Sequence, residues 1–276
     1  MKYETVMVGM ALGQPNEARL EIAGQLAERF GATVIGVAAA EFSPPLYFTS
    51  GESAQKLVDQ GWAAIENRLA ELEGEFRAAM QHRATGVEWR CAETFPTRHI
   101  VQQARACDII VVGAGPRNAL GDPFVQINPS DLVMQAGRPL LVVPDACSWL
   151  DLRSILVAWK DTAEARRAVS DALPLLRKST EVSVVEIVED EADRVAAVSR
   201  IGDVVAWLSR HGVRASQQVP DQLGDAATQL ERIASDVGAG VVIAGAYGHS
   251  RLSEWILGGV TRRLISPSNR CSLLSR

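Results

Sequence analysis

An internal repeat is the feature that most restricts the fold of this 276-residue chain. Residues 108–113 (DIIVVG) align with residues 240–245 (GVVIAG) at an offset of 132. Earlier in each copy, residues 17–19 and 164–166 share the sequence EAR, but here the offset is 147. Self-similarity of this kind indicates two copies of one structural unit. The first copy therefore carries 15 more residues than the second in its middle.

Short apolar runs alternate with segments of helical spacing in both copies. The runs predict strands at residues 5–10, 32–38, 87–92, 109–112 and 140–143, and again at 154–159, 181–188, 213–219, 241–244 and 272–274. Helical spacing of apolar residues predicts helices at 16–30, 163–176 and 260–266. Because strands that alternate with helices form parallel sheets with helical crossovers, each copy is expected to be a doubly wound, Rossmann-like α/β domain.

We expect two tandem domains over residues 1–147 and 151–276, with the boundary inside the segment 144–151. Their last predicted strands, 140–143 and 272–274, are short and apolar. An unpaired apolar edge strand invites association. These two strands are therefore expected to meet and to hold the domains together as a pseudo-dimer.

The additional residues of the first copy fall in the segment 52–82, where apolar residues at spacings of three to five predict a long helix. The segment 41–51 before it combines prolines with aromatic residues. This loop is either a flap or contact surface, or it packs on its own domain.

The composition excludes several classes of function. A formal net charge of -5 provides no basic surface for nucleic acid. No apolar stretch reaches the roughly 18 to 20 residues needed to cross a bilayer, and the N-terminal segment lacks the basic and apolar parts of a secretion signal. We therefore expect a cytoplasmic protein that binds neither nucleic acid nor membranes.

Metal and P-loop chemistry find no support in the sequence. Cys91, Cys107, Cys147 and Cys271 form no CxxC pair, and the four histidines are dispersed. We expect four buried, reduced thiols. No G-x4-G-K-[ST] loop is present, and the segment 113–115 lacks the third glycine of a dinucleotide fingerprint.

The segment 245–261 (GAYGHSRLSEWILGGVT) is the most informative part of the chain. Gly245 and Gly248 follow a predicted buried strand, and Gly258 and Gly259 precede a predicted helix. Glycine lets backbone amides approach a ligand closely and point into one cavity. This pattern suits a phosphate group, and the same glycines also permit a tight strand-to-helix connection without any ligand.

This segment resembles the nucleotide-binding loop of the universal stress protein family, G-x2-G-x9-G followed by a small hydroxyl residue. Gly245, Gly248 and Gly258 fit that spacing. Residues 155–162 (ILVAWKDT) and the helix after them are also similar to the family, and the first half of the chain is similar more weakly. The resemblance implies a tandem member with an adenine-nucleotide α-hydrolase-like fold. It also implies a glycine loop that holds the phosphates of ATP or another adenine nucleotide.

Two positions depart from the family pattern. Gly259 replaces the usual hydroxyl residue, which leaves Thr261 as the nearest hydroxyl. Lys160 stands where an acidic residue near the nucleoside is expected, with Asp161 one place later. Lys160 is either a phosphate contact or a solvated surface residue. The resemblance implies a nucleotide site in the second copy, made of Ala158, Lys160, Asp161, Gly245, Gly248, His249, Gly258, Gly259, Val260 and Thr261.

The first copy is predicted to have lost this site. At the offset of 132, Pro116 stands opposite Gly248 and Ile127 stands opposite Gly259. Proline has no amide proton, and a bulky side chain fills the space that a phosphate would use. The first copy is therefore expected to have a structural role.

Three functions stay open at this point. The first is a stress-response regulatory protein in which nucleotide occupancy changes a surface that a protein partner reads. The second is a nucleotide-free scaffold that uses both copies only to pair surfaces, with further homodimerisation open. The third is a weak ATP-hydrolysing enzyme. It ranks last because His249 and Ser250, as adjacent residues, rarely orient as base and nucleophile, and no carboxylate pair for a metal lies at the loop. No catalytic residue is expected.

Overall fold

The computed structural model describes residues 2–43, 51–115, 122–247, 259–266 and 268–276. The strands are β1 (Thr5–Met10), β2 (Thr33–Ala40), β3 (Val87–Glu93), β4 (Ile109–Gly113), β5 (Leu140–Val143), β6 (Ser154–Ala158), β7 (Glu181–Val185), β8 (Ala215–Gln218), β9 (Val241–Gly245) and β10 (Cys271–Ser275). The helices are α1 (Glu17–Phe30), α2 (Gly51–Met80), α3 (Pro96–Gln103), α4 (Pro129–Gln135), α5 (Ala163–Asp171), α6 (Leu173–Leu176), α7 (Arg194–Arg210), α8 (Ala226–Asp236) and α9 (Gly259–Ile265).

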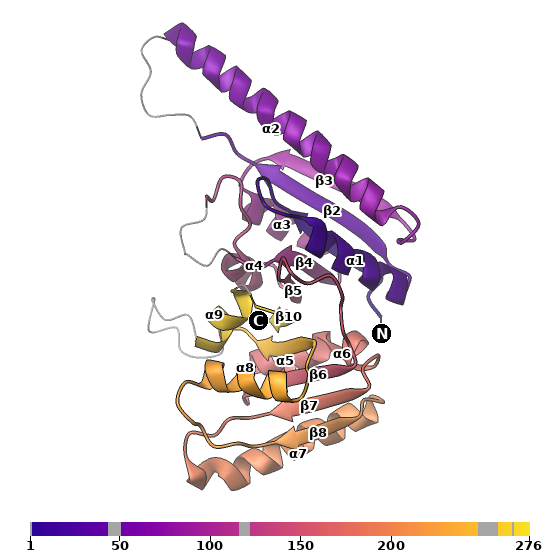
Figure 1. Cartoon of the computed structure of the whole chain (residues 1–276), viewed down its shortest axis with the longest axis vertical. Coiled ribbons are helices and arrows are strands. Elements are labelled where there is room, and N and C mark those ends of the chain that lie inside the picture. The colour runs from indigo at the N-terminus through magenta and orange to yellow at the C-terminus, as the bar shows by residue number, and fades with distance from the viewer. Residues whose placement is uncertain (1, 44–50, 116–121, 248–258, 267) are drawn as a thin grey trace.

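The ten strands of the described residues form one sheet, in the order β3-β2-β1-β4-β5-β10-β9-β6-β7-β8 (Figure 1). Each half of the chain supplies five neighbouring strands in the same order, and the pairs inside each half are parallel. The halves join where β5 and β10 pair antiparallel, with Leu141 opposite Leu273. The predicted doubly wound α/β fold and the predicted meeting of the two last strands are confirmed.

Helices cover both faces of the sheet. Residues of α1, α2, α5, α6 and α7 pack into one cluster of buried apolar side chains, and residues of α3, α4, α8 and α9 pack into a second. Each cluster contains strand residues from both halves, so the core continues across the β5–β10 joint. The domain limits 1–147 and 151–276 stay a prediction.

The β5–β10 joint is mainly apolar, although β10 also contains the buried Ser272 and Ser275. Leu140, Leu141, Leu273 and Leu274 are all fully buried. Strands in the middle of a sheet that is covered on both faces read as continuous apolar runs, which is why these residues do not alternate with polar ones. The pairing also satisfies the backbone groups that each half would otherwise leave open at its edge.

The structure divides one of the predicted helices and contains another as a single long helix. The predicted helix at 163–176 is divided into α5 and α6, because Pro174 has no N–H to donate to the preceding turn. The predicted long helix at 52–82 is α2, which has 30 residues and projects past the sheet in Figure 1. None of the helices in the described ranges has the length and apolar character needed to cross a bilayer.

The loop before α2 is described only in part. The ring of Phe42 lies 6.0 Å from that of Trp62 in α2, measured between centroids, and the Glu41 amide donates to the Phe124 carbonyl. These contacts hold the start of the loop to its own half of the chain. The prediction of a flap or contact surface concerns mainly residues 44–50, which lie outside the described residues.

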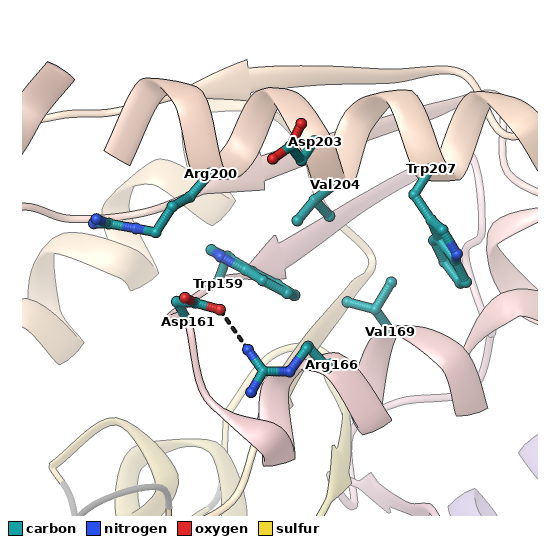
Figure 2. Close-up of a pocket in the computed structure, with 8 residues that line it drawn as sticks. All are labelled: Trp159, Asp161, Arg166, Val169, Arg200, Asp203, Val204 and Trp207. Carbon is teal, nitrogen blue, oxygen red and sulfur yellow. Dashed lines mark hydrogen bonds and ion pairs between the residues drawn. The ribbon is translucent and has the colours of Figure 1, made fainter. Parts of the chain in front are cut away.

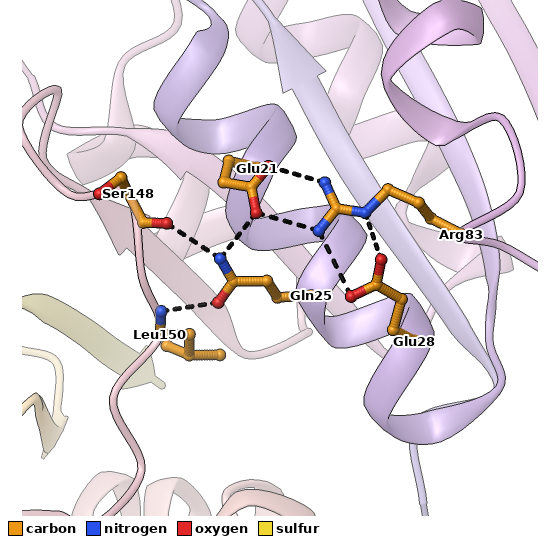
Figure 3. A network of polar contacts seen from close by, with 6 residues as sticks. All are labelled: Glu21, Gln25, Glu28, Arg83, Ser148 and Leu150. Carbon is orange, nitrogen blue, oxygen red and sulfur yellow. Dashed lines mark hydrogen bonds and ion pairs between the residues drawn. The ribbon is translucent and has the colours of Figure 1, made fainter.

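The linker between β5 and β6 is fastened to α1 by side-chain amide contacts (Figure 3). Gln25 donates from Nε2 to the Ser148 carbonyl at 2.9 Å, and its Oε1 accepts from the Leu150 amide at 2.8 Å. Arg29 donates to the Leu150 carbonyl at 2.7 Å. Gln25 is itself held by Glu21, whose carboxylate accepts from Nε2 at 2.8 Å. The linker is therefore an ordered segment bound to the first helix.

A second set of contacts fixes α1 against the end of α2. Arg83, just beyond α2, donates to Glu21 at 2.7 Å and to Glu28 at 2.5 Å (Figure 3). The hydrogen bonds from Arg83 lower the pKa of Glu21, so this carboxylate stays charged at neutral pH. The linker, α1 and α2 are thereby joined by one polar network.

The prediction that all four thiols are buried is wrong. Cys91 is exposed on the edge strand β3, and Cys147 in the linker is only half-buried. Cys107 and Cys271 are buried. The sulfurs of Cys147 and Cys271 lie 3.5 Å apart, although 124 positions separate the two residues in the sequence. Local spacing could not have shown this pair, because the sheet brings the two cysteines together.

Candidate functional site

The predicted site residues that the structure describes include Ala158 at the end of β6 and Gly245 at the end of β9, where the strand order of the second half reverses. The chain leaves β6 through α5 on one face of the sheet, whereas α8 and α9 beside β9 lie on the other face. Ligands of open α/β sheets bind at such a point, beyond the carboxyl ends of the strands. Ala158 ends β6 and pairs with Ala244, so Ala158 and Gly245 lie side by side at this edge.

Gly245 lies against the beginning of α5. A Cβ at this position would be 2.5 Å from the backbone nitrogen of Ala165 and 2.7 Å from the carbonyl carbon of Glu164. Both are backbone atoms that cannot turn aside. Glycine is therefore required here by close packing of β9 against α5, a reason that the sequence motif did not reveal.

The loop after β9 is tied to α9. Tyr247 has a positive φ of 62°, and its amide nitrogen lies 3.5 Å from Oγ1 of the buried Thr261. The preceding amide, of Ala246, donates to the Ser275 carbonyl in β10 at 2.8 Å. Thr261 thus faces the loop that the sequence assigned to phosphate binding, and Val260 beside it packs half-buried into the core on the α8–α9 face.

Gly259 differs from Gly245 in having open space around it. Among the described residues, the nearest heavy atom to an added Cβ is Oδ1 of Asp225, at 4.0 Å. Asp225 caps α8 by accepting from the Thr228 amide at 2.9 Å, and its bonds to Thr228 lower its pKa. A charged carboxylate therefore lies at the rim of the site. The sequence around Asp225 gives no sign of this position, because an Asp at the start of a helix is typical of a helix cap.

Lys160 and Asp161 have different surroundings. Lys160 is exposed, as expected for a solvated surface residue. Asp161 accepts from Nη1 of Arg166 at 2.5 Å. Asp161 is therefore engaged by an arginine one turn into α5, and its charge is already compensated in the structure described here.

The corresponding place in the first half is filled by an arginine. Arg19 of α1 is 2% exposed and donates to the carbonyl of Gly9 in β1 at 3.2 Å and to Oε1 of Gln14 at 3.4 Å. A Cβ on Gly113, the last residue of β4, would collide with its guanidinium. The guanidinium thus occupies the space between the carboxyl ends of β1 and β4.

The burial of Arg19 has an electrostatic cost. Burial lowers the pKa of Arg19 below its ordinary value, and the charges of Asp145 and Glu17 oppose this shift. Its Nε has no hydrogen-bond partner in the described part of the chain. Such a group stays in place only where the surrounding packing holds it there.

Arg166 occupies the position of the repeat that matches Arg19, yet it points elsewhere. Asp161 precedes Arg166 by five residues, and Gln14 precedes Arg19 by five. A carboxylate binds a guanidinium more strongly than an amide oxygen does, and Arg166 turns outward to Asp161. Arg166 is exposed, so its guanidinium is not buried beside the last strand residues as that of Arg19 is. The change from Gln14 to Asp161, one of several differences between the two loops, thus accompanies two opposite arginine orientations.

A cavity of about 430 Å³ lies between α5 and α7 (Figure 2). The ring of Trp159 forms its floor, and Val169, Val204 and Trp207 extend its apolar wall. Trp159 belongs to the core cluster of the α5–α7 face, whereas Val260 and Ala158 belong to that of the opposite face. The cavity is therefore separate from the predicted phosphate site.

Charged residues at the rim of this cavity are mostly paired with one another or with their neighbours. Arg166 binds Asp161, and Arg200 binds Glu186 at 2.7 Å and Asp193 at 2.8 Å. Asp203 completes the lining. Of the predicted site residues that the structure describes, Asp161 also lines this cavity.

Several predicted residues cannot be placed. Gly248, His249 and Gly258 lie outside the described residues, as does Pro116 of the first half. Ile127, predicted to block the first copy, is buried in the core. Within the described ranges, no three His, Cys, Asp or Glu side chains gather as a metal site would require.

Comparisons with known proteins agree with this architecture. A universal stress protein from Archaeoglobus fulgidus DSM 4304 superposes with a TM-score of 0.71 at 16% sequence identity, covering 98% of this chain and 96% of that one. The functionally unknown protein PA1789 from Pseudomonas aeruginosa PAO1 superposes with a TM-score of 0.62 at 16% identity, covering 99% and 92%. Similarity at this level of identity shows a common fold along the whole length.

The sequence comparisons found a family match in the first half of the chain. No curated protein matched the sequence. The family model described as the universal stress protein family matches residues 2–144. This match covers more than half of the 276 residues, and the same strand order recurs in the second half. The chain belongs to the universal stress protein family.

Proposed function

We propose that this universal stress protein is a cytoplasmic regulatory protein that binds an adenine nucleotide in its second half. The nucleotide would lie beyond the carboxyl ends of β6 and β9, with its phosphates near Gly245 and Gly259. Occupancy would change a surface that a protein partner reads. The function is proposed to be non-catalytic, with no residue of the site acting as general base.

The contrast between the two arginines is the observation that best supports this proposal. Arg19 fills the space between β1 and β4, whereas Arg166 turns away from the space between β6 and β9. The two halves have the same strand order, so they offer two equivalent places for a ligand. An anionic ligand fits only where a side chain has not taken that place, which favours the second half.

Open space at Gly259 supports the same assignment. The glycine is followed by half-buried Val260 and buried Thr261, and nothing among the described residues lies within 3.4 Å of its missing Cβ. Asp225 at the rim would repel a phosphate unless a cation or Arg263, whose charge already acts on Asp225, offsets it. We propose that Asp225 limits affinity and favours a nucleotide that binds together with Mg²⁺.

A thermal-shift titration of the full chain with Mg-ATP tests the proposal. At 100 times its dissociation constant, a ligand stabilises the folded state by about 2.7 kcal/mol, which is several degrees in melting temperature. The same titration with Mg-GTP is expected to give a smaller shift. Absence of any shift with ATP, ADP or AMP would favour the nucleotide-free scaffold, and sustained phosphate release would favour the ATP-hydrolysing enzyme.

Gly259→Val should abolish the ATP-dependent shift while leaving the melting temperature of the ligand-free protein nearly unchanged. The added Cβ would meet nothing closer than 4.0 Å among the described residues, so we expect the main effect on the ligand and not on packing. Gly74→Ala is the matched control, since Gly74 in α2 also has nothing within 4 Å and lies in the other half. A full ATP response in Gly259→Val would contradict the placement of the phosphates.

Lys160→Ala should weaken ATP binding by no more than about tenfold, because one exposed charge contact is worth less than the 1.4 kcal/mol of a tenfold change. Lys160 is exposed in the structure. Isothermal titration calorimetry on the folded variant measures the change. A loss beyond a hundredfold would make Lys160 a principal ligand contact.

A further inference from the structure

Two thiols from distant parts of the chain meet at the joint between the halves. Cys147 Sγ lies 3.5 Å from Cys271 Sγ and 3.4 Å from the Trp149 carbonyl oxygen. Cys271 is the first residue of β10 and is fully buried, whereas Cys147 in the linker is half-buried. The pair has one member open to small solutes and one member shielded from them.

Both backbones that carry the pair are held in place. Cys271 pairs with Val241 of β9 in the sheet ladder. The linker is fixed on its other side, where Gln25 binds Ser148 and Leu150 on both sides of Trp149 (Figure 3). The Cys147 amide donates to the Pro144 carbonyl at 2.9 Å, which closes a turn at the linker's start. The short distance between the sulfurs is thus a property of ordered segments.

The surroundings favour a dithiol over a metal site. A structural zinc site needs four ligands. No third His, Cys, Asp or Glu joins these two cysteines within the described ranges. Cys147 packs against the apolar core cluster that contains Cys271.

We propose that Cys147 and Cys271 form a reversible redox site, at which a hydroperoxide converts the two thiols into a disulfide that joins the linker to β10. Cys147 is the attacking residue because it is the accessible one. Cys271 is the resolving residue, held beside it by the sheet. Thiol reductants reverse the reaction.

The step balances with one peroxide. The Cys147 thiolate attacks one oxygen of hydrogen peroxide; an S–O bond forms, the O–O bond breaks, and hydroxide leaves and takes up a proton as water. The Cys271 sulfur then attacks the sulfenic acid; the S–S bond forms, the S–O bond breaks, and the oxygen leaves as water with the proton of Cys271. Two thiols are oxidised by two electrons, and one peroxide is reduced to two waters.

Electrostatics at the pair agree with this division of roles. A hydrogen bond from Cys271 lowers the pKa of Cys147, while that of Cys271 is raised by its interaction with Cys147 and by burial. Burial raises the pKa of Cys107 to about 12, which keeps that thiol protonated and inert. Cys91 is exposed on β3, a strand that carries no other cysteine, and it provides an internal reference for thiol oxidation outside the pair.

Oxidation of the full-length, reduced protein with hydrogen peroxide tests the proposal. We expect native protein to lose two of its four thiols, to lose two hydrogens in mass, and to yield one cross-linked peptide that contains Cys147 and Cys271. Dithiothreitol should restore all four thiols. Cys147 should be oxidised before Cys107, because a hydrogen bond from Cys271 lowers the pKa of Cys147 whereas burial raises that of Cys107.

Three variants distinguish oxidation at this site from nonspecific oxidation of the other thiols. Cys91→Ser, the matched control, should form the same cross-link at the same rate. Cys147→Ser should abolish the link and protect Cys271. Cys271→Ala should leave Cys147 as a sulfenic acid that a dimedone probe captures, and alanine avoids the buried hydroxyl that a serine would introduce.

Other outcomes overturn the proposal. These are retention of four thiols by the folded protein, a cross-link through Cys91 or Cys107, and sulfenic acid on Cys147 that persists while Cys271 is present. A circular dichroism spectrum that matches the untreated protein ensures that each result refers to the folded state.

Discussion

Leu273→Ala should lower the free energy of unfolding by about 2 to 5 kcal/mol, the range for truncating a fully buried leucine. Leu273 is fully buried in β10 and lies opposite Leu141, so the cavity would open at the joint between the halves. Neighbouring strands hold this position from both sides, which limits how far the structure can collapse into the space. Urea denaturation followed by circular dichroism measures the loss.

Leu57→Ala is the control for this experiment, because Leu57 on α2 is 40% exposed and its truncation should change stability little. The same urea curves test whether the halves unfold together. Since both core clusters contain residues from both halves, we expect one cooperative transition. Two well-separated transitions, or a Leu273→Ala effect confined to one of them, would contradict a shared core.

Gly245→Ala should cost about 3 kcal/mol, at the upper end of what overpacking usually costs. The new Cβ would lie 2.5 Å from the Ala165 nitrogen, so α5 or β9 must move. A movement of α5 would also displace Asp161 and Arg166 at the proposed nucleotide site. We therefore expect both a lower melting temperature and a weaker response to ATP.

Gly259→Ala is the matched control, because it adds the same methyl group to the same site without a clash among the described residues. Its melting temperature should stay near that of the unmodified protein. If Gly245→Ala melted at the same temperature as Gly259→Ala, the tight contact between β9 and α5 would have to be flexible, and the structural need for glycine at 245 would be disproved.

The fold could be predicted from the sequence because buried parallel strands leave a strong local signal. The apolar run at 109–112 became β4, and the run at 140–143 became β5. The predicted helix at 163–176 is too long. The helical spacing of its apolar residues continues past the break between α5 and α6, which lies next to Pro174. The signal for each strand lies within the strand itself, and so no partner had to be known.

The site could be predicted only in part, because its details depend on partners distant in sequence. The glycine motif pointed to Gly245 and Gly259, yet only the structure shows that one is closed by α5 and the other is open. The motif likewise gave no reason to include Asp225. The matching positions of Arg19 and Arg166 were visible in the repeat, but their opposite orientations depend on Gln14 and Asp161.

Because the two halves belong to one chain, their sequences can differ from each other. In an assembly of two identical subunits, every substitution appears twice, so a residue that fills one ligand space fills both. Here β5 and β10 pair within a single polypeptide, and Arg19 could close one space while Arg166 turns outward to Asp161. The pairing also survives dilution, because the effective concentration of one half near the other is set by the linker and not by the amount of protein. The molecule can thus keep a symmetric framework while the ends of its two central strand pairs differ.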